Sequence, residues 1–218
     1  LFTGSKSFRG VKDSQLVKIG CEYSRLNIDF TSNDREQNAE ILIKGKRHAT
    51  LNGIKKRSAA ELGNELKAVV FSPIHLSMIK DGPSERRKFI DNALCQLKSN
   101  YRNLLKEYNR ALLQRNTLLK DLAKNPELDS MLYVWDGNLA KIGAKIIYQR
   151  LKYIEALKPF IKDIFSGISS GRENIDLIYS SCAEFDADLN IIEQNLLSAF
   201  ESSKTADIIN KTTTKGPH

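Results

Sequence analysis

The chain has 218 residues, of which 41% are hydrophobic and 28% are charged, and this composition is typical of a globular protein. Its apolar runs are far shorter than the roughly 18 residues that suggest a membrane span, and it has no signal-peptide pattern. We therefore expect a cytoplasmic protein without membrane contact. The net charge of +8 favours polyanionic partners, with nucleic acid first among them.

Residues 1–80 show the period of two that is typical of half-buried antiparallel strands. Apolar residues alternate with polar ones at Leu26, Ile28, Phe30, Ala39, Ile41 and Ile43, and turns are predicted at Gly45 and Asn52-Gly53. Basic residues gather on the predicted hairpins: Lys44, Lys46, Arg47, Lys55, Lys56 and Arg57. Such residues contact DNA phosphates in some proteins and only guard strand edges in others, and both interpretations stay open here.

The segment from Gly82 to Asp91 predicts the start of a helix, because Pro83 suits the first turn and Gly82 is an acceptable N-cap. Three consecutive cations, Arg86–Lys88, follow where a helix prefers anions. Together with the free N–H groups of the first turn they form a ready site for phosphate or carboxylate. The alternative is a solvated face on which cations pair with neighbouring carboxylates, such as Arg87 with Asp91.

From Pro83 to about residue 164 the apolar period is that of helices. One face holds Ile90, Leu94, Leu97 and Tyr101, a second holds Leu105, Tyr108, Leu112, Leu119 and Leu122, and a coiled-coil-like seam runs through Leu128, Leu132, Trp135, Leu139, Ile142 and Ile146. Trp135 is predicted to be a core residue, and Pro159 to kink or end its helix. A strand over Ile175 to Tyr179, a helix from Leu189 and a further strand after Lys211 are expected to follow.

The chain contains three cysteines and three histidines. They are Cys21, Cys95, Cys182, His48, His75 and His218. An odd number of widely separated cysteines is typical of reduced thiols, and none of the six residues has the spacing of zinc ligands. The sequence therefore predicts neither a disulfide framework nor a metal site.

Six motifs stand out along the chain: Lys6-Ser7-Phe8-Arg9, Val69-Val70-Phe71-Ser72-Pro73-Ile74-His75-Leu76, Gly82 to Asp91, Tyr108 to Lys120, Trp135-Asp136 and Gly216-Pro217-His218. In sequence and in order they resemble the motifs of the RecF family of bacterial recombination ATPases, which are related to the SMC and ABC-type ATPases. The resemblance covers nearly the whole chain.

The resemblance implies an α+β fold: the β-rich lobe of an SMC/ABC-type ATPase head with a compact helical insertion domain, truncated at both ends. On this view residues 1–80 belong to the ATPase lobe, residues 81–166 form the helical domain, and residues 167–218 return to the lobe. No G-x-x-x-x-G-K-[ST] phosphate loop is found in the sequence. We therefore expect an internal fragment that binds no cofactor and is inactive as an ATPase, while the intact parent would bind ATP and Mg²⁺, form an ATP-dependent homodimer and act as a weak DNA-dependent ATPase.

The resemblance also suggests roles for individual residues. Arg9 would sense the nucleotide near its γ-phosphate, unless it is a surface arginine before a hairpin. Ser72, Pro73 and His75 fall in a loop that links the nucleotide site to the helical domain, although Ile74 and His75 replace two acidic residues of the family. The expected phosphate contacts are Arg86, Arg87, Lys88, Arg110, Arg115, Lys46, Arg47, Lys55 and Lys56, with structural ion pairing as the rival interpretation.

The function that the resemblance implies is that of a recombination mediator. It would bind double-stranded or gapped DNA under ATP control and support recombinational repair and replication restart. The alternative function is a structural helical module that docks a partner protein such as RecR without direct DNA contact.

Overall fold

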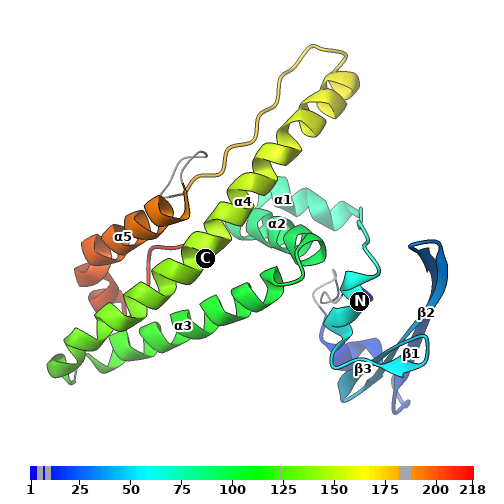
Figure 1. Ribbon diagram of the computed structural model, residues 1–218, viewed down its shortest axis with the longest axis horizontal. Helices are drawn as coiled ribbons and strands as arrows, with labels where there is room; N and C mark the ends of the chain where they lie inside the picture. The colour runs from blue at the N-terminus through cyan, green and yellow to red at the C-terminus, as the bar shows by residue number, and fades with distance from the viewer. Residues whose placement is uncertain (4–6, 8–10, 123, 182–187) are drawn as a thin grey trace. The chain divides into compact units, whose positions relative to one another are not determined.

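The computed structural model describes residues 1–218 except residues 4–6, 8–10, 123 and 182–187, and only the backbone at positions 74 and 77. The chain forms two compact units, Leu1–Ser99 and Asn100–His218 (Figure 1). The first contains an antiparallel sheet and short helices, and the second consists of helices joined by extended segments. The predicted α+β class is therefore confirmed.

The sheet has four antiparallel strands in the order β1 (Ser24–Ser32), β2 (Arg35–Lys44), β3 (Lys46–Leu51) and β4 (Ile54–Lys55). Leu26 lies opposite Ile41, and Ile41 lies opposite Ala49, so the alternating apolar residues share one face. Asn52 and Gly53 both have positive φ angles, 50° and 77°, as a tight hairpin turn requires. The predicted hairpins are confirmed.

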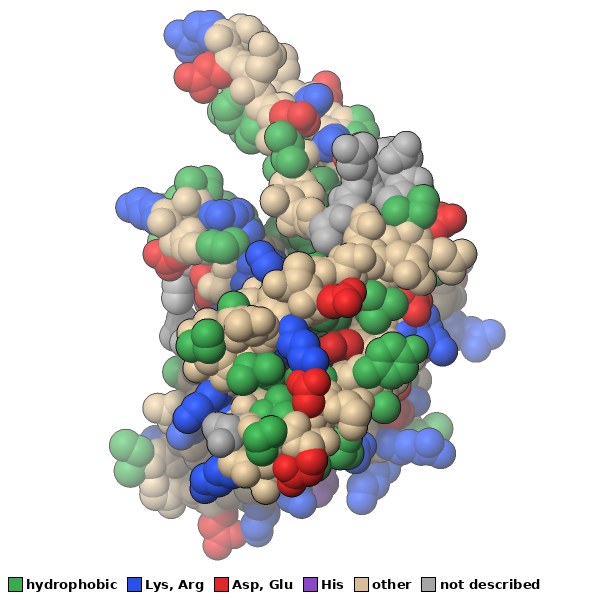
Figure 2. Space-filling model, turned by 90° about the vertical axis from the view of Figure 1, so that its left-hand side faces the viewer, with side chains coloured by type: hydrophobic (Ala, Val, Ile, Leu, Met, Phe, Trp, Pro, Cys, Tyr) green, Lys and Arg blue, Asp and Glu red, His purple; other side chains and the backbone are tan. Residues whose placement is uncertain are grey.

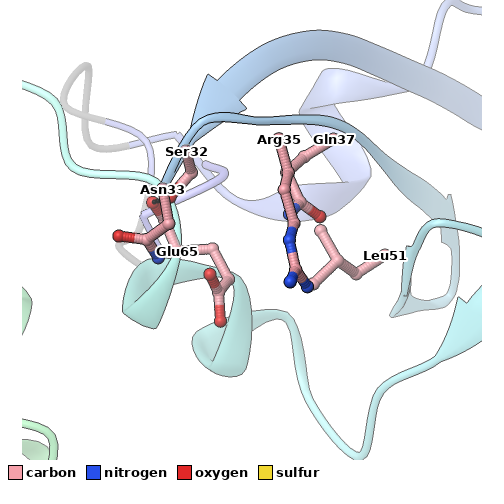
Figure 3. Close-up of a pocket in the computed structure, with 6 residues that line it drawn as sticks. All are labelled: Ser32, Asn33, Arg35, Gln37, Leu51 and Glu65. Atoms are coloured by element: carbon pink, nitrogen blue, oxygen red, sulfur yellow. Dashed lines mark hydrogen bonds between the residues drawn. The ribbon is translucent and has the colours of Figure 1, made fainter.

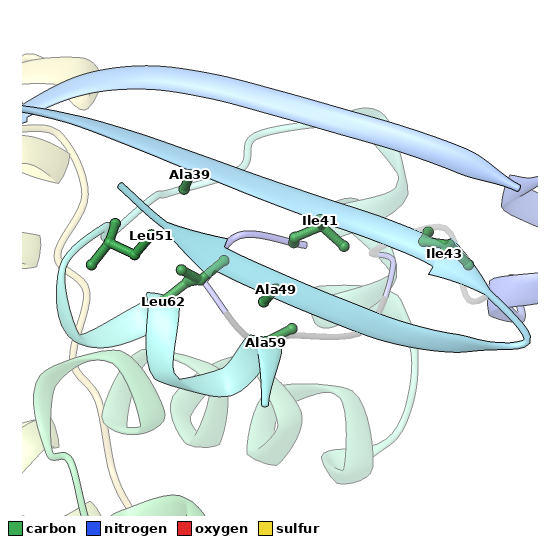
Figure 4. Close-up of a cluster of buried hydrophobic side chains, with 7 residues drawn as sticks. All are labelled: Ala39, Ile41, Ile43, Ala49, Leu51, Ala59 and Leu62. Atoms are coloured by element: carbon green, nitrogen blue, oxygen red, sulfur yellow. The ribbon is translucent and has the colours of Figure 1, made fainter. Parts of the chain in front are cut away.

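The core of the first unit lies between the inner face of the sheet and the 3₁₀ helix η2 (Ala59–Asn64) (Figure 4). Its fully buried members are Ala39, Ile41, Ile43, Ala49, Leu51, Ala59 and Leu62. The small side chains of Ala49 and Ala59 let η2 approach the strands closely, so a short helix suffices to cover the apolar face. Burial of one face fixes the register of all three long strands.

The remaining elements of the first unit are η1 (Asp13–Leu16), η3 (Pro73–Leu76), α1 (Ser77–Lys80) and α2 (Pro83–Leu97). The predicted helix start at Pro83 is confirmed, with Gly82 as an extended N-cap. The prediction that Ile90, Leu94, Leu97 and Tyr101 lie on one face of a single helix is wrong. The helix ends at Leu97, which is 56% exposed, and Tyr101 begins the next helix. Ser99 and Asn100 stand at the break, where short polar side chains favour turns.

The second unit contains α3 (Tyr101–Asp121), η4 (Pro126–Met131), α4 (Leu132–Ser169) and α5 (Leu189–Asn210). The helix α4 packs against both α3 and α5. Near its start a cluster of Leu118, Leu119, Leu122 and Leu132 is covered by Leu128, Trp135 and Ile208. The core role predicted for Trp135 is confirmed. None of the helices in the described ranges is both long enough and apolar enough to cross a membrane.

The structure differs from the predictions for the second unit at Pro159 and in two predicted strands. Of the two outcomes predicted for Pro159, a kink or an end of the helix, the end is excluded, because α4 continues to Ser169 and closes with Ser170 and Gly171 at positive φ. The segments from Ile175 and from Lys211 are not strands. The first is extended and runs beside α4 (Figure 1), and the half-buried residues Ile175, Leu177 and Tyr179 alternate along it. Packing on a helix therefore produced the period of two that we had attributed to a sheet.

Candidate nucleic-acid interface

The cations at the start of α2 have partners within the chain. Arg86 is exposed, and its Nη1 donates to the carbonyl oxygens of Met78 and Asp81 at 3.2 and 3.1 Å. These bonds cap the C-terminal end of α1, where cations are favoured. Lys88 pairs with Glu85 at 2.5 Å, while Arg87 is half-buried. Exposed pairs of this kind are weak, so they leave Arg86 and Lys88 able to exchange these partners for a phosphate.

The hairpin cations do not form one patch, because neighbouring residues of a strand point to opposite faces. Lys46 and Lys55 are exposed, and Lys56 is half-buried. Arg47 lies on the core side, where its Nε and Nη2 donate to the two carboxylate oxygens of Asp13 at 2.7 and 2.6 Å. This bidentate pair leaves the Arg47 side chain 15% exposed. Arg47 thus fastens η1 to the sheet.

Two arginines of α3, Arg110 and Arg115, were both predicted to contact phosphate, but they differ in their exposure to solvent. Arg110 is exposed, whereas Arg115 has no exposed surface. The Nε of Arg115 donates to Asp136 Oδ1 at 2.6 Å, and its Nη1 donates to Asp207 Oδ2 and Thr213 Oγ1 at 2.7 and 2.9 Å. A buried guanidinium in this position joins α3, α4, α5 and the C-terminal segment, and it has no surface to offer DNA. Arg115 therefore cannot contact a DNA phosphate in this structure.

The Arg115 cluster also fixes the segment after α5. Asp207 Oδ1 accepts hydrogen bonds from the N–H and hydroxyl of Thr214 at 2.9 and 2.7 Å, and Asn116 Oδ1 accepts the same pair of bonds from Thr213 at 2.8 and 2.7 Å. Burial raises the pKa of Asp136, and its hydrogen bond to Arg115 offsets this rise only in part. Sequence reasoning missed this cluster, because residues so far apart in sequence carry no signal of their contact.

The end of the same segment contacts the helices through Tyr108 and Arg150. The Tyr108 hydroxyl lies 3.0 Å from Nδ1 of His218, and burial raises the pKa of Tyr108. Arg150 is buried, and its Nη1 donates to the carbonyl oxygen of Pro217 at 2.5 Å and to the Tyr179 hydroxyl at 3.0 Å. The Gly216-Pro217-His218 motif is therefore held by α3 and α4.

The loop predicted to link nucleotide and helices contains η3. The backbone N–H of Ser72 donates to Nδ1 of His75 at 3.1 Å, and the His75 N–H donates back to the Ser72 carbonyl at 2.9 Å. His75 is half-buried and stabilises its own turn, while Pro73 is exposed. Arg9 lies outside the described residues, so its role stays a prediction.

A polar pocket of about 330 Å³ lies beside the β1–β2 turn (Figure 3). It is lined by Ser32, Asn33, Arg35, Gln37, Leu51 and Glu65. Its two charged residues, Arg35 and Glu65, have opposite signs, so the pocket has little net charge. Among the described residues no group of three or more His, Cys, Asp and Glu could hold a metal ion. The side of the molecule in Figure 2 shows Lys and Arg scattered among acidic and apolar side chains, without a patch of a single sign.

Comparison with known proteins identifies related sequences and structures, although no family model matches the chain. It is 38% identical to the DNA replication and repair protein RecF of Agathobacter rectalis over 98% of the chain and 58% of that protein, and 36% identical to RecF of Clostridium perfringens with the same coverage. The structure of the recombination mediator protein RecF-ATPrS in the RecFOR pathway superposes with a TM-score of 0.93 at 33% identity, over 100% of this chain and 60% of that one. The chain spans little more than half the length of these relatives. Similarity of sequence and of fold over almost all its residues identifies the chain as a RecF homologue.

Proposed function

We propose that this chain is part of a RecF-type recombination mediator that binds double-stranded or gapped DNA under ATP control and supports recombinational repair and replication restart. The observation that carries this proposal is the similarity to RecF in both sequence and fold, at 38% identity to a RecF protein over 98% of the chain. The net charge of +8 supports a polyanionic ligand.

The finer architecture belongs to the same proposal. It assigns residues 1–80 and 167–218 to the β-rich lobe of an SMC/ABC-type ATPase head and residues 81–166 to its compact helical insertion, although residues 100–218 of this chain form one compact unit. The whole protein binds ATP and Mg²⁺, dimerises when ATP is bound, and acts with a RecR-like partner. The solved RecF-ATPrS and RecF-ATP structures support nucleotide binding by a protein of this fold.

The proposed DNA contacts are cations with exposed side chains. They are Arg86, Lys88, Arg110, Lys46 and Lys55, with half-buried Arg87 and Lys56 beside them. Contacts to phosphates give affinity and salt dependence with little sequence preference, which suits a protein that acts on gaps of any sequence.

The test is fluorescence-anisotropy binding of the chain to a labelled gapped duplex across a salt series. An Arg86→Ala, Arg87→Ala, Lys88→Ala variant removes three charges at the α2 start, and a Lys12→Ala, Lys18→Ala, Lys67→Ala variant removes three exposed charges elsewhere in the same unit. We expect a linear fall of log affinity with log salt whose slope becomes shallower by about 0.9 for each phosphate that the variant no longer neutralises. Equal behaviour of the two variants would move the contacts away from α2, and absence of salt-dependent binding by the parent would contradict the proposal.

A second candidate function, docking of a partner protein such as RecR, is favoured by apolar side chains on α4. Phe160, Ile164 and Ile168 follow one another at four-residue spacing and are 67%, 61% and 75% exposed. They continue the face of α4 that is buried at Leu139 and Ile146. Co-elution of the chain with purified RecR, abolished in an Ile164→Asp variant, would support this function. Co-elution unaffected by that change would contradict it.

A further inference from the structure

The middle of α4 carries positive charge without any carboxylate. Between Asp136 and Glu155 the sequence has no Asp or Glu, but it contains Lys141, Lys145, Arg150 and Lys152. Acidic residues are frequent in the rest of the chain, 26 among 218 residues, so five helical turns without one form an unusual segment.

Three of these cations lie on one side of the helix. At 100° per residue, Lys141, Lys145 and Lys152 fall within a narrow sector, and all three are exposed. The opposite side of α4 is buried at Ile147, Ile154 and Arg150. Packing against α3 and α5 thus turns the lysine side of α4 outward.

The neighbouring carboxylates are bonded to other cations. Asp136 accepts a hydrogen bond from buried Arg115, and Glu155, three residues after Lys152, pairs with Lys158. Like charges at i and i+4, as in Lys141 and Lys145, destabilise a helix. Neither of these two lysines has an ion-pair partner in the part of the chain that the structure describes. A bound anion would remove this repulsion.

Tyr148 completes the sector. Tyr148 lies between Lys145 and Lys152 in the sequence, and Lys152 Nζ is 5.5 Å from its ring centroid. A half-buried tyrosine presents an apolar body and a polar hydroxyl, and the latter can donate to a phosphate oxygen. The sector therefore combines three cations with a neutral donor on a rigid helix.

We propose that Lys141, Lys145 and Lys152 form an additional DNA-contact surface, the α4 lysine stripe, which binds the phosphate backbone of duplex DNA. This inference rests on the proposed function as a DNA-binding mediator. The stripe is about 16 Å long at 1.5 Å per residue. Phosphates follow one another about every 3.4 Å along the axis for each strand, so a rod of this length can contact several of them at once. Such contacts position the protein without selecting a sequence.

The experiment compares three proteins for binding a labelled mixed-sequence duplex over a salt series: the parent chain, a Lys141→Ala, Lys145→Ala, Lys152→Ala variant, and a control from which the same number of charges is removed. The control is Lys124→Ala, Lys162→Ala, Lys204→Ala, in which Lys162 and Lys204 already pair with Asp176 and Asp129. We expect the stripe variant to bind more weakly and to show a salt slope shallower by about 0.9 for each phosphate left without its lysine, up to about 2.7 in all. The control should stay close to the parent. Thermal unfolding followed by fluorescence confirms that each variant is folded.

Other outcomes separate this inference from the proposed function. If the stripe variant binds DNA as tightly as the parent does, the proposal that the stripe contacts DNA is wrong, while the proposed function stands. If both variants bind equally weakly, the effect is one of net charge alone, and the proposal that the stripe contacts DNA is again wrong. Competition by polyglutamate as effective as that by unlabelled duplex would overturn the assignment to DNA. Absence of salt-dependent binding by the parent would overturn both proposals.

Discussion

Arg115 donates a hydrogen bond to Asp207 over 2.7 Å, and neither side chain has any exposed surface. Asp136, on α4, accepts a second bond from the same guanidinium at 2.6 Å, and the Phe200 ring lies 5.3 Å away. A single residue thus connects three helices through charges removed from water. Removing one partner of such a cluster costs far more than its net contribution, because the other charges stay buried.

We predict that Arg115→Met destabilises the helical unit by about 3–5 kcal/mol, since Asp207 would remain buried without its cation. Urea unfolding followed by tryptophan fluorescence measures this directly. Trp135 is the only tryptophan of the chain and packs in the helical unit, so the signal reports on that unit. Lys204→Met, which breaks a partly exposed pair with Asp129 in the same unit, should cost less than about 1 kcal/mol. Similar destabilisation by both variants would contradict the role of Arg115.

Replacing two glycines of α4 with alanine should change the unfolding free energy in opposite directions. A Cβ at Gly143 would lie 3.0 Å from Leu196 Cδ1 and 3.3 Å from Tyr108 Cε2, whereas one at Gly137 would meet nothing within 4 Å. Overpacking costs about 1–3 kcal/mol, more than the roughly 1 kcal/mol by which alanine favours a helix over glycine. We therefore expect Gly143→Ala to destabilise the unit and Gly137→Ala to stabilise it by about 0.5–1 kcal/mol. Stabilisation by both changes in urea unfolding would show that α5 does not approach α4 closely.

The pKa of Asp136 predicts a pH dependence of stability. Burial raises this pKa above 3.8, so the folded state binds the proton more tightly than the unfolded state does. The contribution of Asp136 to stability is therefore largest when it is protonated and falls as the pH rises through the window just above 3.8. In an Asp136→Asn variant this dependence is absent.

The measurement is the difference in unfolding free energy between Asp136→Asn and the parent as a function of pH. Removal of the charge interaction with Arg115 shifts the difference at neutral pH, so its change with pH is the diagnostic quantity. The difference should move in favour of the variant as the pH rises from 3.8 toward neutral. A change in the opposite direction would mean that pairing with Arg115 outweighs burial and lowers the pKa.

The sequence predicted local structure well where one interaction dominates. The alternation at Ala39, Ile41 and Ile43 fixed a strand, and Gly82-Pro83 fixed a helix start, because burial of one face and backbone geometry act over a few residues. It failed where partners are distant. The period of two from Ile175 to Tyr179 arises from contact with α4, and the predicted end of the helix at Pro159 is absent, since α4 continues on both sides of it.

The candidate interface shows the same limit at the level of single side chains. Arg110 and Arg115 looked alike in sequence, yet one is exposed and the other is fully buried. The burial of Arg115 depends on Asp136 and Asp207, which are 21 and 92 residues away. Lys141, Lys145 and Lys152 were not singled out, since only the packed bundle shows that their side of α4 is outward.

The length of α4 has a mechanical consequence. From Asp136, where Arg115 holds it, to Ser169 at its end the helix continues for 33 residues without a break. At 1.5 Å per residue this is a lever arm of about 50 Å, so a tilt of about 5° at the anchored end displaces the other end by roughly 4 Å. Repacking around Arg115 would therefore be amplified along α4, and the exposed residues Phe160, Ile164 and Ile168 lie on the part of the lever that moves most.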